Sequence, residues 1–375
     1  MAKIAFISLW DAGKRNVESG YSFSMRNQLA RHFDVVDLFP LALRGEALFL
    51  PLRALYKASG KYYHPMREPS LLKALARPIG RFLADTRPDA IFSPSSLPLS
   101  YVETDIPWAF CSDQLFCDFA ETYVRQPAGR FLRLGDAQEA RALAAASLAS
   151  FPSASSVRKA VEYYGVSAEK VHAIPWGGNL PHQIEESAVE AAIEARPFDR
   201  CQLVFLGRDW KRKGGEALVA TVAELNRQGV QTHATIIGCE PPGLDTDHFT
   251  VYPFLDKGRI DHFELFSTVL FSSHFLFHPS RAEAYGQALC EAAAFGVPTI
   301  GSMAGGIPTI VRDGETGYLR PYDAPASEFS ALIGNSLAEP VRYRTMARAA
   351  RLDYRQRLNW DSFGDRLATS IKSFC

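Results

Sequence analysis

The sequence has no excess of charge of either sign, since its 41 lysine and arginine residues are balanced by 41 aspartate and glutamate residues. Nucleic-acid-binding proteins usually present a basic excess to phosphates, and no recognised nucleic-acid-binding module is present. The six cysteines form no C-x-x-C pair and no regular spacing, which argues against a disulfide framework. We therefore expect no nucleic-acid partner, and free thiols in a reducing compartment.

Long apolar runs are also missing, because no stretch approaches the roughly 18 apolar residues of a membrane span. The first residues lead directly into a strand pattern, without the basic region and apolar core of a secretory signal. We expect a cytoplasmic protein. No low-complexity tract or fixed-period repeat interrupts the 375 residues, of which 47% are hydrophobic. This length exceeds what most single cores reach, which predicts two domains.

Near the amino terminus, the fingerprint of dinucleotide-binding proteins is absent. A predicted strand at 3–10 runs into a polar loop with Ser19 and Gly20, and a helix is predicted at 21–32. A glycine loop after a first strand suggests nucleotide binding, but it lacks the G-x-G-x-x-G spacing. The loop therefore predicts either a nucleotide-binding segment or an ordinary turn.

Strand and helix patterns alternate along both halves, which predicts two α/β domains, each with a parallel sheet. The polar, acidic segment at 175–200 is expected to be the hinge between them. The second half repeats the alternation over 202–320 and ends in helical stretches at 326–357 and 360–373. In the first half, strands are predicted at 3–10, 34–39, 89–93, 107–111, 148–152 and 170–175, with helices that include 70–85 and 136–146.

A basic loop at 207–215 follows an apolar strand predicted at 202–207 and precedes a helix. It lacks the Walker spacing and is not a P-loop. A glycine-flanked basic loop between a strand and a helix nevertheless predicts an anion site, because helix amino termini attract negative charge. The basic side chains of this loop include Arg208, Lys213 and, as a reserve candidate, Lys211.

Two glutamates, Glu283 and Glu291, stand eight positions apart around Gly286. In one continuous helix, eight steps of about 100° would turn the carboxylates onto different flanks. A short strand pattern at 275–279 and a helical pattern at 287–295 instead predict a strand, a loop with the first glutamate, and a helix with the second. This arrangement can hold a sugar and a nucleotide at once, although two glutamates near a helix start can also be a cap and a solvated face.

This segment resembles the E-x7-E signature of retaining glycosyltransferases with the GT-B fold, of the family-four type, and the basic loop resembles their G-R…K-G element. The resemblance implies two Rossmann-like parallel-sheet domains facing across a cleft: an acceptor domain at 1–178, a nucleotide-sugar donor domain at 179–355, and a terminal helix at 356–375 that crosses back to the first domain. It implies that Glu283 lies at the reacting sugar, that Glu291 holds the ribose, and that Arg208 and Lys213 neutralise the diphosphate. The other donor-binding positions it implies are Ser19, Gly20, Gly207, Ala284, Tyr285, Gly286, Gly305 and Gly306.

The sequence departs from that family at one acceptor position. Many relatives place a histidine after the fourth strand of the first domain, whereas residues 107–113 contain none. Asp113 either occupies that place or caps the following helix, a common role of aspartate. Because such enzymes are thought to use the leaving phosphate itself as the base, a missing side-chain base is compatible with the reaction.

Neither a metal nor another cofactor is expected. The pair Asp245 and Asp247 forms a D-x-D sequence, but its neighbours Pro242 and Gly243 are typical of a solvent loop. The histidines show no zinc-ligand spacing. Basic side chains and helix amino termini can stabilise the departing diphosphate without metal.

Residues 41–88 carry nine lysines and arginines against three acidic residues, interleaved with leucines and tyrosines. This local excess predicts either a surface that meets an anionic membrane or a lipid-diphosphate acceptor, or an ordinary amphipathic helix with a solvated basic face.

The sequence therefore predicts a retaining, metal-independent hexosyltransferase. Its donor would be a UDP- or GDP-hexose, and its acceptor a hydroxyl of a glycan, a glycolipid or a small molecule. A nucleotide-sugar epimerase or phosphorylase of the same fold, or a non-catalytic nucleotide-sugar-binding protein, is the alternative. A phosphorylase would need a pyridoxal lysine, and nothing singles one out.

Overall fold

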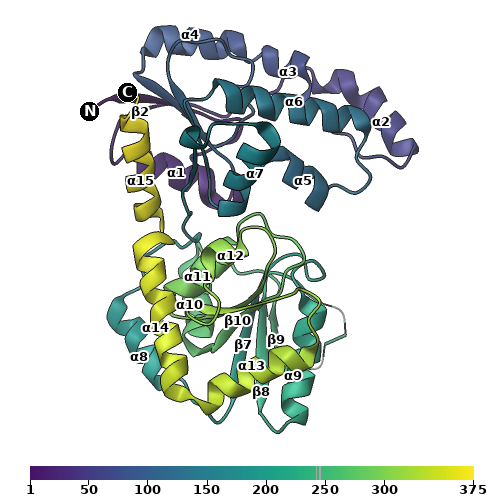
Figure 1. The fold of residues 1–375 in the computed structure, drawn as a ribbon, viewed down its shortest axis with the longest axis vertical. Coiled ribbons are helices and arrows are strands. Elements are labelled where there is room, and N and C mark those ends of the chain that lie inside the picture. The colour runs from purple at the N-terminus through teal and green to yellow at the C-terminus, as the bar shows by residue number, and fades with distance from the viewer. Residues whose placement is uncertain (242, 245) are drawn as a thin grey trace. The chain divides into compact units, whose positions relative to one another are not determined.

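The computed structural model describes residues 1–241, 243–244 and 246–375. The chain divides into two compact units, which Figure 1 shows as ribbons. The first unit comprises Met1–Pro175 and Trp360–Cys375, and the second comprises Trp176–Asn359. The chain thus leaves the first unit once and returns to it with its last residues.

The first unit is built on one parallel sheet of six strands in the order β2-β1-β3-β4-β5-β6. Strands β3 to β5 are buried at every residue, as expected for a parallel sheet covered by helices on both faces. The strands are β1 Lys3–Ile7, β2 Asp34–Leu38, β3 Ala90–Ser93, β4 Trp108–Cys111, β5 Leu148–Phe151 and β6 Val171–Ala173. The helices are α1 Tyr21–Leu29, α2 Leu50–Ala58, α3 Pro69–Lys73, α4 Ala76–Thr86, α5 Phe116–Tyr123, α6 Gly129–Ala145 and α7 Ala154–Tyr164, with short 3-10 turns at Glu18–Gly20, Glu46–Phe49, Pro65–Arg67 and Ala168–Lys170.

The last helix, α15 (Trp360–Lys372), belongs to the first unit and packs against α1. Its buried face includes Phe363 and Leu367. Gln28 Nε2 donates to Asp361 Oδ1 at 3.0 Å, and a Cβ at Gly364 would lie 2.7 Å from Gln28 Oε1. A glycine at this position therefore allows the close helix contact. The predicted return of the terminal helix to the first domain is confirmed.

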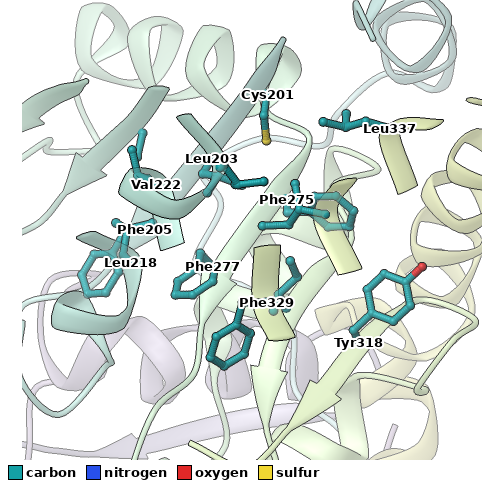
Figure 2. Packing of buried hydrophobic residues seen from close by; sticks show 14 of the residues in the cluster. Cys201, Leu203, Phe205, Leu218, Val222, Phe275, Phe277, Tyr318, Phe329 and Leu337 are labelled. Carbon is teal, nitrogen blue, oxygen red and sulfur yellow. The ribbon is translucent and has the colours of Figure 1, made fainter. Parts of the chain in front are cut away.

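In the described part of the second unit, six parallel strands form a sheet in the order β12-β11-β10-β7-β8-β9. The aromatic rings of Phe205, Phe275, Phe277 and Phe329 pack in its core (Figure 2). The strands are β7 Cys201–Leu206, β8 Thr232–Ile237, β9 Phe249–Tyr252, β10 Phe275–His278, β11 Thr299–Ser302 and β12 Gly317–Arg320. The helices are α8 Glu186–Ala195, α9 Gly215–Arg227, α10 Ile260–Ser272, α11 Gln287–Ala294, α12 Ile307–Ile310, α13 Ala326–Ala338 and α14 Pro340–Arg357.

The predicted α/β class is confirmed, but two predicted helices are each divided in two by proline. The helix predicted at 70–85 is α3 followed by α4, because the ring of Pro78 lacks an N–H and clashes with the carbonyl four residues earlier. The stretch predicted at 326–357 breaks into α13 and α14 at Glu339, whose backbone (φ −121°, ψ 69°) leaves the helical region immediately before Pro340.

Two further expectations concern cysteines and membranes. All six cysteines are free thiols, as predicted. Within the described residues, no helix is both long enough and apolar enough to cross a lipid bilayer. The polypeptide thus forms two separate cores, and neither is held together by a disulfide.

Candidate active site

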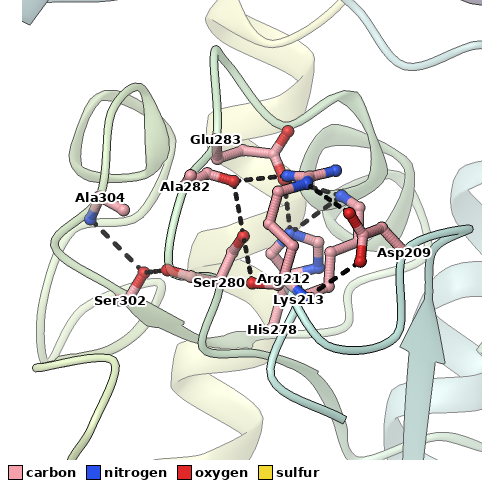
Figure 3. A network of polar contacts seen from close by, with 9 residues as sticks. All are labelled: Asp209, Arg212, Lys213, His278, Ser280, Ala282, Glu283, Ser302 and Ala304. Atoms are coloured by element: carbon pink, nitrogen blue, oxygen red, sulfur yellow. Dashed lines mark hydrogen bonds and ion pairs between the residues drawn. The ribbon is translucent and has the colours of Figure 1, made fainter. Parts of the chain in front are cut away.

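The candidate site of the second unit lies where two neighbouring strands of its sheet end. Strand β7 is followed by the basic loop at 207–214, and β10 is followed by the loop at 279–286. These strands pair in parallel, so both loops leave the same edge of the sheet. Ligands of α/β proteins bind at this carboxyl edge. Figure 3 shows the polar side chains that the two loops bring together there.

Glu283 is the centre of this network. Its Oε2 accepts a hydrogen bond from Lys213 Nζ at 2.7 Å and lies 3.0 Å from His278 Nε2. Arg212 Nη1 is 3.7 Å from the same oxygen. The side chains of Lys213 and Glu283 are each 12% exposed and His278 is fully buried. One carboxylate oxygen is thus shared by an ammonium group and an imidazole in a nearly closed environment.

Burial decides the protonation of His278. It lowers the pKa of the imidazole to about 4, and the nearby Lys213 charge acts in the same direction. Burial also opposes ionisation of Glu283, but the Lys213 charge and the hydrogen bond to His278 outweigh it and hold the pKa of that carboxyl well below its usual range. Near neutral pH an ionised Glu283 therefore faces a neutral imidazole, whose Nε2 must carry the hydrogen and donate to the carboxylate.

Arg212 connects the two loops. Its Nη1 donates to Ala282 O at 2.5 Å, and its backbone N–H donates to Asp209 Oδ1 at 3.1 Å. In return, the backbone N–H of Arg281 donates to Arg212 O at 2.8 Å. These bonds fix the loop that carries Glu283 relative to the loop that carries Lys213, so the carboxylate is positioned before any ligand arrives.

Glycines allow the backbone to approach this network closely. A Cβ at Gly207 would lie 2.2 Å from Lys213 Cδ, and one at Gly305 would lie 1.6 Å from Glu283 O. Gly306 N–H donates to the same carbonyl at 3.3 Å. Because real Cβ atoms do not approach so closely, the 207 and 305–306 turns pack against the site only as glycines.

Glu291 lies on α11 and is 6% exposed. Its Oε1 accepts from Lys257 Nζ at 2.5 Å and from the backbone N–H of Asn179 at 3.0 Å. Gly178 lies directly against it, since a Cβ there would be 2.6 Å from Glu291 Cγ. α11 begins after Gly286, whose φ of 110° is in the left-handed region that favours glycine. The chain therefore breaks between the two glutamates, as predicted.

The structure brings most of the predicted donor-site residues together in the second unit. Tyr285 is buried and its hydroxyl donates to Trp176 O at 2.9 Å. Arg208 and Lys211 are exposed and form no ion pair within the described residues. The predicted residues that lie around the two glutamates are Gly207, Lys213, Ala284, Tyr285, Gly286, Gly305 and Gly306.

Three predicted residues belong to the first unit. Ser19 and Gly20 adopt left-handed backbone conformations, with φ of 54° and 81°. Asp113 lines a pocket of that unit. The N-cap residue of α5 is Leu115, so Asp113 is not itself the N-cap residue of that helix. Of the D-x-D pair, Asp245 lies outside the described residues.

Sequence reasoning missed four residues of the site: Arg212, Lys257, His278 and Asn179. A signal existed for His278, because it ends a buried strand at the carboxyl edge of a parallel sheet. For Lys257 there was none, since 34 positions separate it from Glu291. Arg212 could not be distinguished from the other basic residues of its loop, because sequence spacing does not reveal which side chain of a basic turn points inward.

Comparison with known proteins shows which proteins the sequence is similar to. Residues 200–338 match the family model of the glycosyl transferases group 1. The sequence is 25% identical over 232 residues to the D-inositol 3-phosphate glycosyltransferase of Thermobifida fusca, which covers 56% of this chain and 52% of that protein. It is 26% identical over 183 residues to the phosphatidylinositol N-acetylglucosaminyltransferase gpi3 subunit of Schizosaccharomyces pombe, covering 47% and 39%. The chain thus spans about half the length of the curated relatives it matches.

Among solved structures, the sucrose-phosphate synthase of Thermosynechococcus elongatus superposes with a TM-score of 0.70 at 19% identity, covering 100% of this chain and 99% of that one. Anabaena Alr3699/HepE, solved with UDP-glucose, superposes with a TM-score of 0.65 at 16% identity and covers 100% of both chains. At this identity the likeness establishes the GT-B fold. The resemblance to the group 1 glycosyltransferases is confirmed by the family match.

Burial of His278 makes the free energy of unfolding depend on pH. Its folded pKa of about 4 lies below the unfolded value of about 6.5, so the unfolded chain takes up the proton first as pH falls. The contribution of His278 to stability is complete above about pH 6.5 and is lost between about pH 6.5 and 4, up to about 3 kcal/mol. We expect urea unfolding to follow this trend, and His278→Gln to flatten it. An unchanged pH slope in the variant would show that the imidazole is not held neutral.

Proposed function

We propose that the protein is a retaining glycosyltransferase that moves a hexosyl group from a UDP- or GDP-hexose to a hydroxyl of a glycan, a glycolipid or a small molecule. The observation that carries this proposal is Glu283, an ionised carboxylate held between Lys213 and the neutral His278 at the carboxyl edge of a parallel sheet. The D-inositol 3-phosphate glycosyltransferase among the relatives and the UDP-glucose complex of HepE support the same class of reaction.

The charges suit the two ends of the bond that breaks. The departing diphosphate gains negative charge, which Lys213 and Arg208 on the basic loop would neutralise. The anomeric carbon gains positive charge, which the Glu283 carboxylate would favour while it orients the donor hydroxyls. Glu291 would accept hydrogen bonds from the ribose, since Lys257 and the Asn179 N–H both bind its Oε1 and fix the orientation of the carboxylate.

The reaction itself is tested by incubating the protein with UDP-, GDP- and ADP-hexoses and a panel of hydroxyl acceptors, with and without EDTA. We expect release of nucleoside diphosphate that depends on the acceptor and persists in EDTA, because side-chain cations neutralise the leaving group. A non-catalytic binding protein would bind nucleotide sugar but release no diphosphate. Release that requires inorganic phosphate would identify a phosphorylase, and activity that is lost in EDTA and restored by manganese would refute the metal-independent mechanism.

We call Lys213 and Arg208, which would neutralise the diphosphate, the diphosphate clamp. If they have this role, replacing either should lower the affinity for free nucleoside diphosphate. Lys213→Ala and Arg208→Ala should each weaken it by about 1.5–3 kcal/mol, because each removes a charge-assisted hydrogen bond to phosphate. Lys211→Ala tests the reserve candidate. Arg200→Ala is the matched control, since this exposed arginine precedes β7 and therefore lies at the opposite edge of the sheet. Calorimetry that finds both clamp variants unchanged would remove these residues from the site.

The role of Glu283 predicts a loss of turnover without a loss of binding. Glu283→Gln keeps the size and a hydrogen-bonding group but removes the charge, so kcat should fall about 100-fold or more, while the donor KM changes little. Glu216→Gln, an exposed carboxylate on α9, is the control. NMR of the product should find the anomeric configuration of the donor. An inverted linkage, or near-normal turnover in Glu283→Gln, would contradict the mechanism.

We further propose that α2 contacts an anionic membrane at its surface. None of its residues is buried. Leu50 and Leu55 on the helix are 57% and 65% exposed, and Leu48 in the turn before it is 82% exposed. Arg53 and Lys57 are exposed one turn apart on the same helix. An exposed apolar group beside cations is typical of helices that lie in the interface of anionic lipids.

Vesicle flotation tests this contact. The protein should float with vesicles of phosphatidylcholine and phosphatidylglycerol but not with phosphatidylcholine alone, and salt should weaken the association. Replacing Arg53 and Lys57 by glutamine should weaken it by about 2 kcal/mol, at about 1 kcal/mol per cation. The control replaces Arg77 and Arg81, two exposed cations one turn apart on α4. Equal loss in both variants would show that general basic charge, rather than α2, is responsible.

A further inference from the structure

The first unit contains a pocket of about 530 Å³. Its walls come from the segment after β1, the segment at 62–67, the segment after β4 and helices α5 and α6. Aromatic rings dominate the lining, which gives flat apolar surfaces of the kind that stack against the C–H face of a sugar ring or against an aromatic substituent. These rings include those of Trp10, Tyr62, Phe116, Phe119, Tyr123 and Phe131.

Two carboxylates, Glu18 and Asp113, also line the pocket. Glu18 is tightly positioned, because Tyr21 Oη donates to its Oε1 at 2.5 Å and the Ser22 hydroxyl donates to its Oε2. Its backbone φ of 50° and that of Ser19, 54°, lie in the left-handed region that disfavours residues with a Cβ. Strained backbone of this kind accumulates at ligand sites.

The basic side chains of the lining do not offset these acids. Arg67 forms an ion pair with Glu139 at 3.4 Å and hydrogen-bonds to Gln138, and its guanidinium lies 4.4 Å above the Phe116 ring. His64 Nδ1 accepts a hydrogen bond from the Met66 N–H, and burial lowers the pKa of the imidazole. The positive charge of Arg67 is therefore balanced within the protein, and His64 is neutral near pH 7.

The pocket consequently disfavours further negative charge. Burial raises the pKa of Glu18, and the charge of the neighbouring Asp113 acts in the same direction. The hydrogen bonds from Ser22 and Tyr21 oppose this shift but do not cancel it. A phosphate would meet these acids with like-charge repulsion. A hydroxyl donates to an ionised carboxylate and accepts from a protonated one, so it suits Glu18 in either state.

We infer that this pocket binds an uncharged, hydroxyl-bearing acceptor with an apolar substituent, a neutral glycoside, and that Glu18 and Asp113 exclude phosphorylated acceptors. The inference rests on the proposed function in taking the ligand to be the acceptor. It departs from those curated relatives that act on an inositol phosphate, as their names state.

The apolar substituent has a continuous path on the protein. Phe116 and Phe131 of the pocket belong to a small hydrophobic cluster that also contacts Leu52 and Tyr56 of α2. The pocket wall thus continues into the core side of the same helix that exposes Leu50 and Leu55. A glycoside whose aglycone is apolar would fill the aromatic part of the pocket, while its hydroxyls meet the carboxylates.

Direct binding tests this selection without any nucleotide. Phenyl β-D-glucoside, phenyl β-D-galactoside and phenyl α-D-mannoside would be titrated by calorimetry against glucose 6-phosphate and inositol 3-phosphate. We expect at least one phenyl hexoside to bind, and both phosphates to bind at least tenfold more weakly. Binding should also change the tryptophan fluorescence, and Trp10→Phe should abolish that change because Trp10 lines the pocket.

Variants of the same size test whether the two carboxylates cause the preference for hexosides over phosphates. Glu18→Gln and Asp113→Asn should each weaken hexoside binding about tenfold and reduce the preference over the phosphates. Glu162→Gln and Asp85→Asn, which remove exposed carboxylates of α7 and α4, should leave both unchanged. If the pocket variants fail to fold, the Trp10→Phe fluorescence experiment still reports where the hexoside binds.

The outcomes separate this inference from the proposed function. Phosphates that bind as tightly as the hexosides, or a panel in which no hexoside binds, would overturn the inference even when nucleoside diphosphate is released from a UDP-hexose with another acceptor. Conversely, the protein could bind a hexoside through Glu18 and Asp113 and yet release no nucleoside diphosphate. That result would support the neutral-glycoside pocket and refute the transferase reaction.

Discussion

The pairing of Lys213 with Glu283 beside His278 is the interaction on which the second unit's site depends. A carboxylate that is 12% exposed is stable as an anion only with a partner, and removing one member of a buried pair typically costs about 3–5 kcal/mol because the other charge stays uncompensated. The pair therefore requires the 207–214 and 279–286 loops to meet. Arg212 and the glycines at 207 and 305 serve that requirement, since each either bonds across the loops or makes room for them.

The same pair implies that ligand binding would exchange one hydrogen-bond partner of Lys213 for another. In the proposed reaction a diphosphate that approached Lys213 would compete with Glu283 for the ammonium hydrogens, and the sugar hydroxyls would replace the hydrogen bonds that the carboxylate lost. In the proposed reaction the neutral His278 would keep its contact with Glu283, so the anion would retain a partner. In that proposal a neutral imidazole would hold Glu283 less strongly than a charged one, because it adds a hydrogen bond without a full positive charge.

Sequence patterns predicted the architecture well because both sheets are buried, and buried parallel strands produce continuous apolar runs. They also placed Glu283 and Glu291 on either side of a chain break, since Gly286 and the strand before it are local features. They could not find Lys257, whose contact with Glu291 exists only after β9 and α11 are packed, nor choose Arg212 within its basic turn. The single helix predicted at 70–85 is α3 and α4 in the structure, because Pro78 lacks a backbone N–H and its ring clashes with the carbonyl four residues earlier.

The two units differ in the charge that they offer to a ligand, and this difference bears on how two substrates would be kept apart. In the second unit Lys213, Arg208 and Lys211 belong to one loop, which would attract an anionic donor. In the first unit Glu18 and Asp113 line the aromatic pocket, and the cation of Arg67 is already balanced by Glu139. A nucleotide sugar would therefore be favoured electrostatically in the second unit and disfavoured in the first. A neutral glycoside would be little affected by the basic loop and would be selected by stacking and hydroxyl contacts. The charge of each site depends on side chains that are held by contacts within their own unit. This selection between charged and neutral ligands therefore needs no conformational change in either unit.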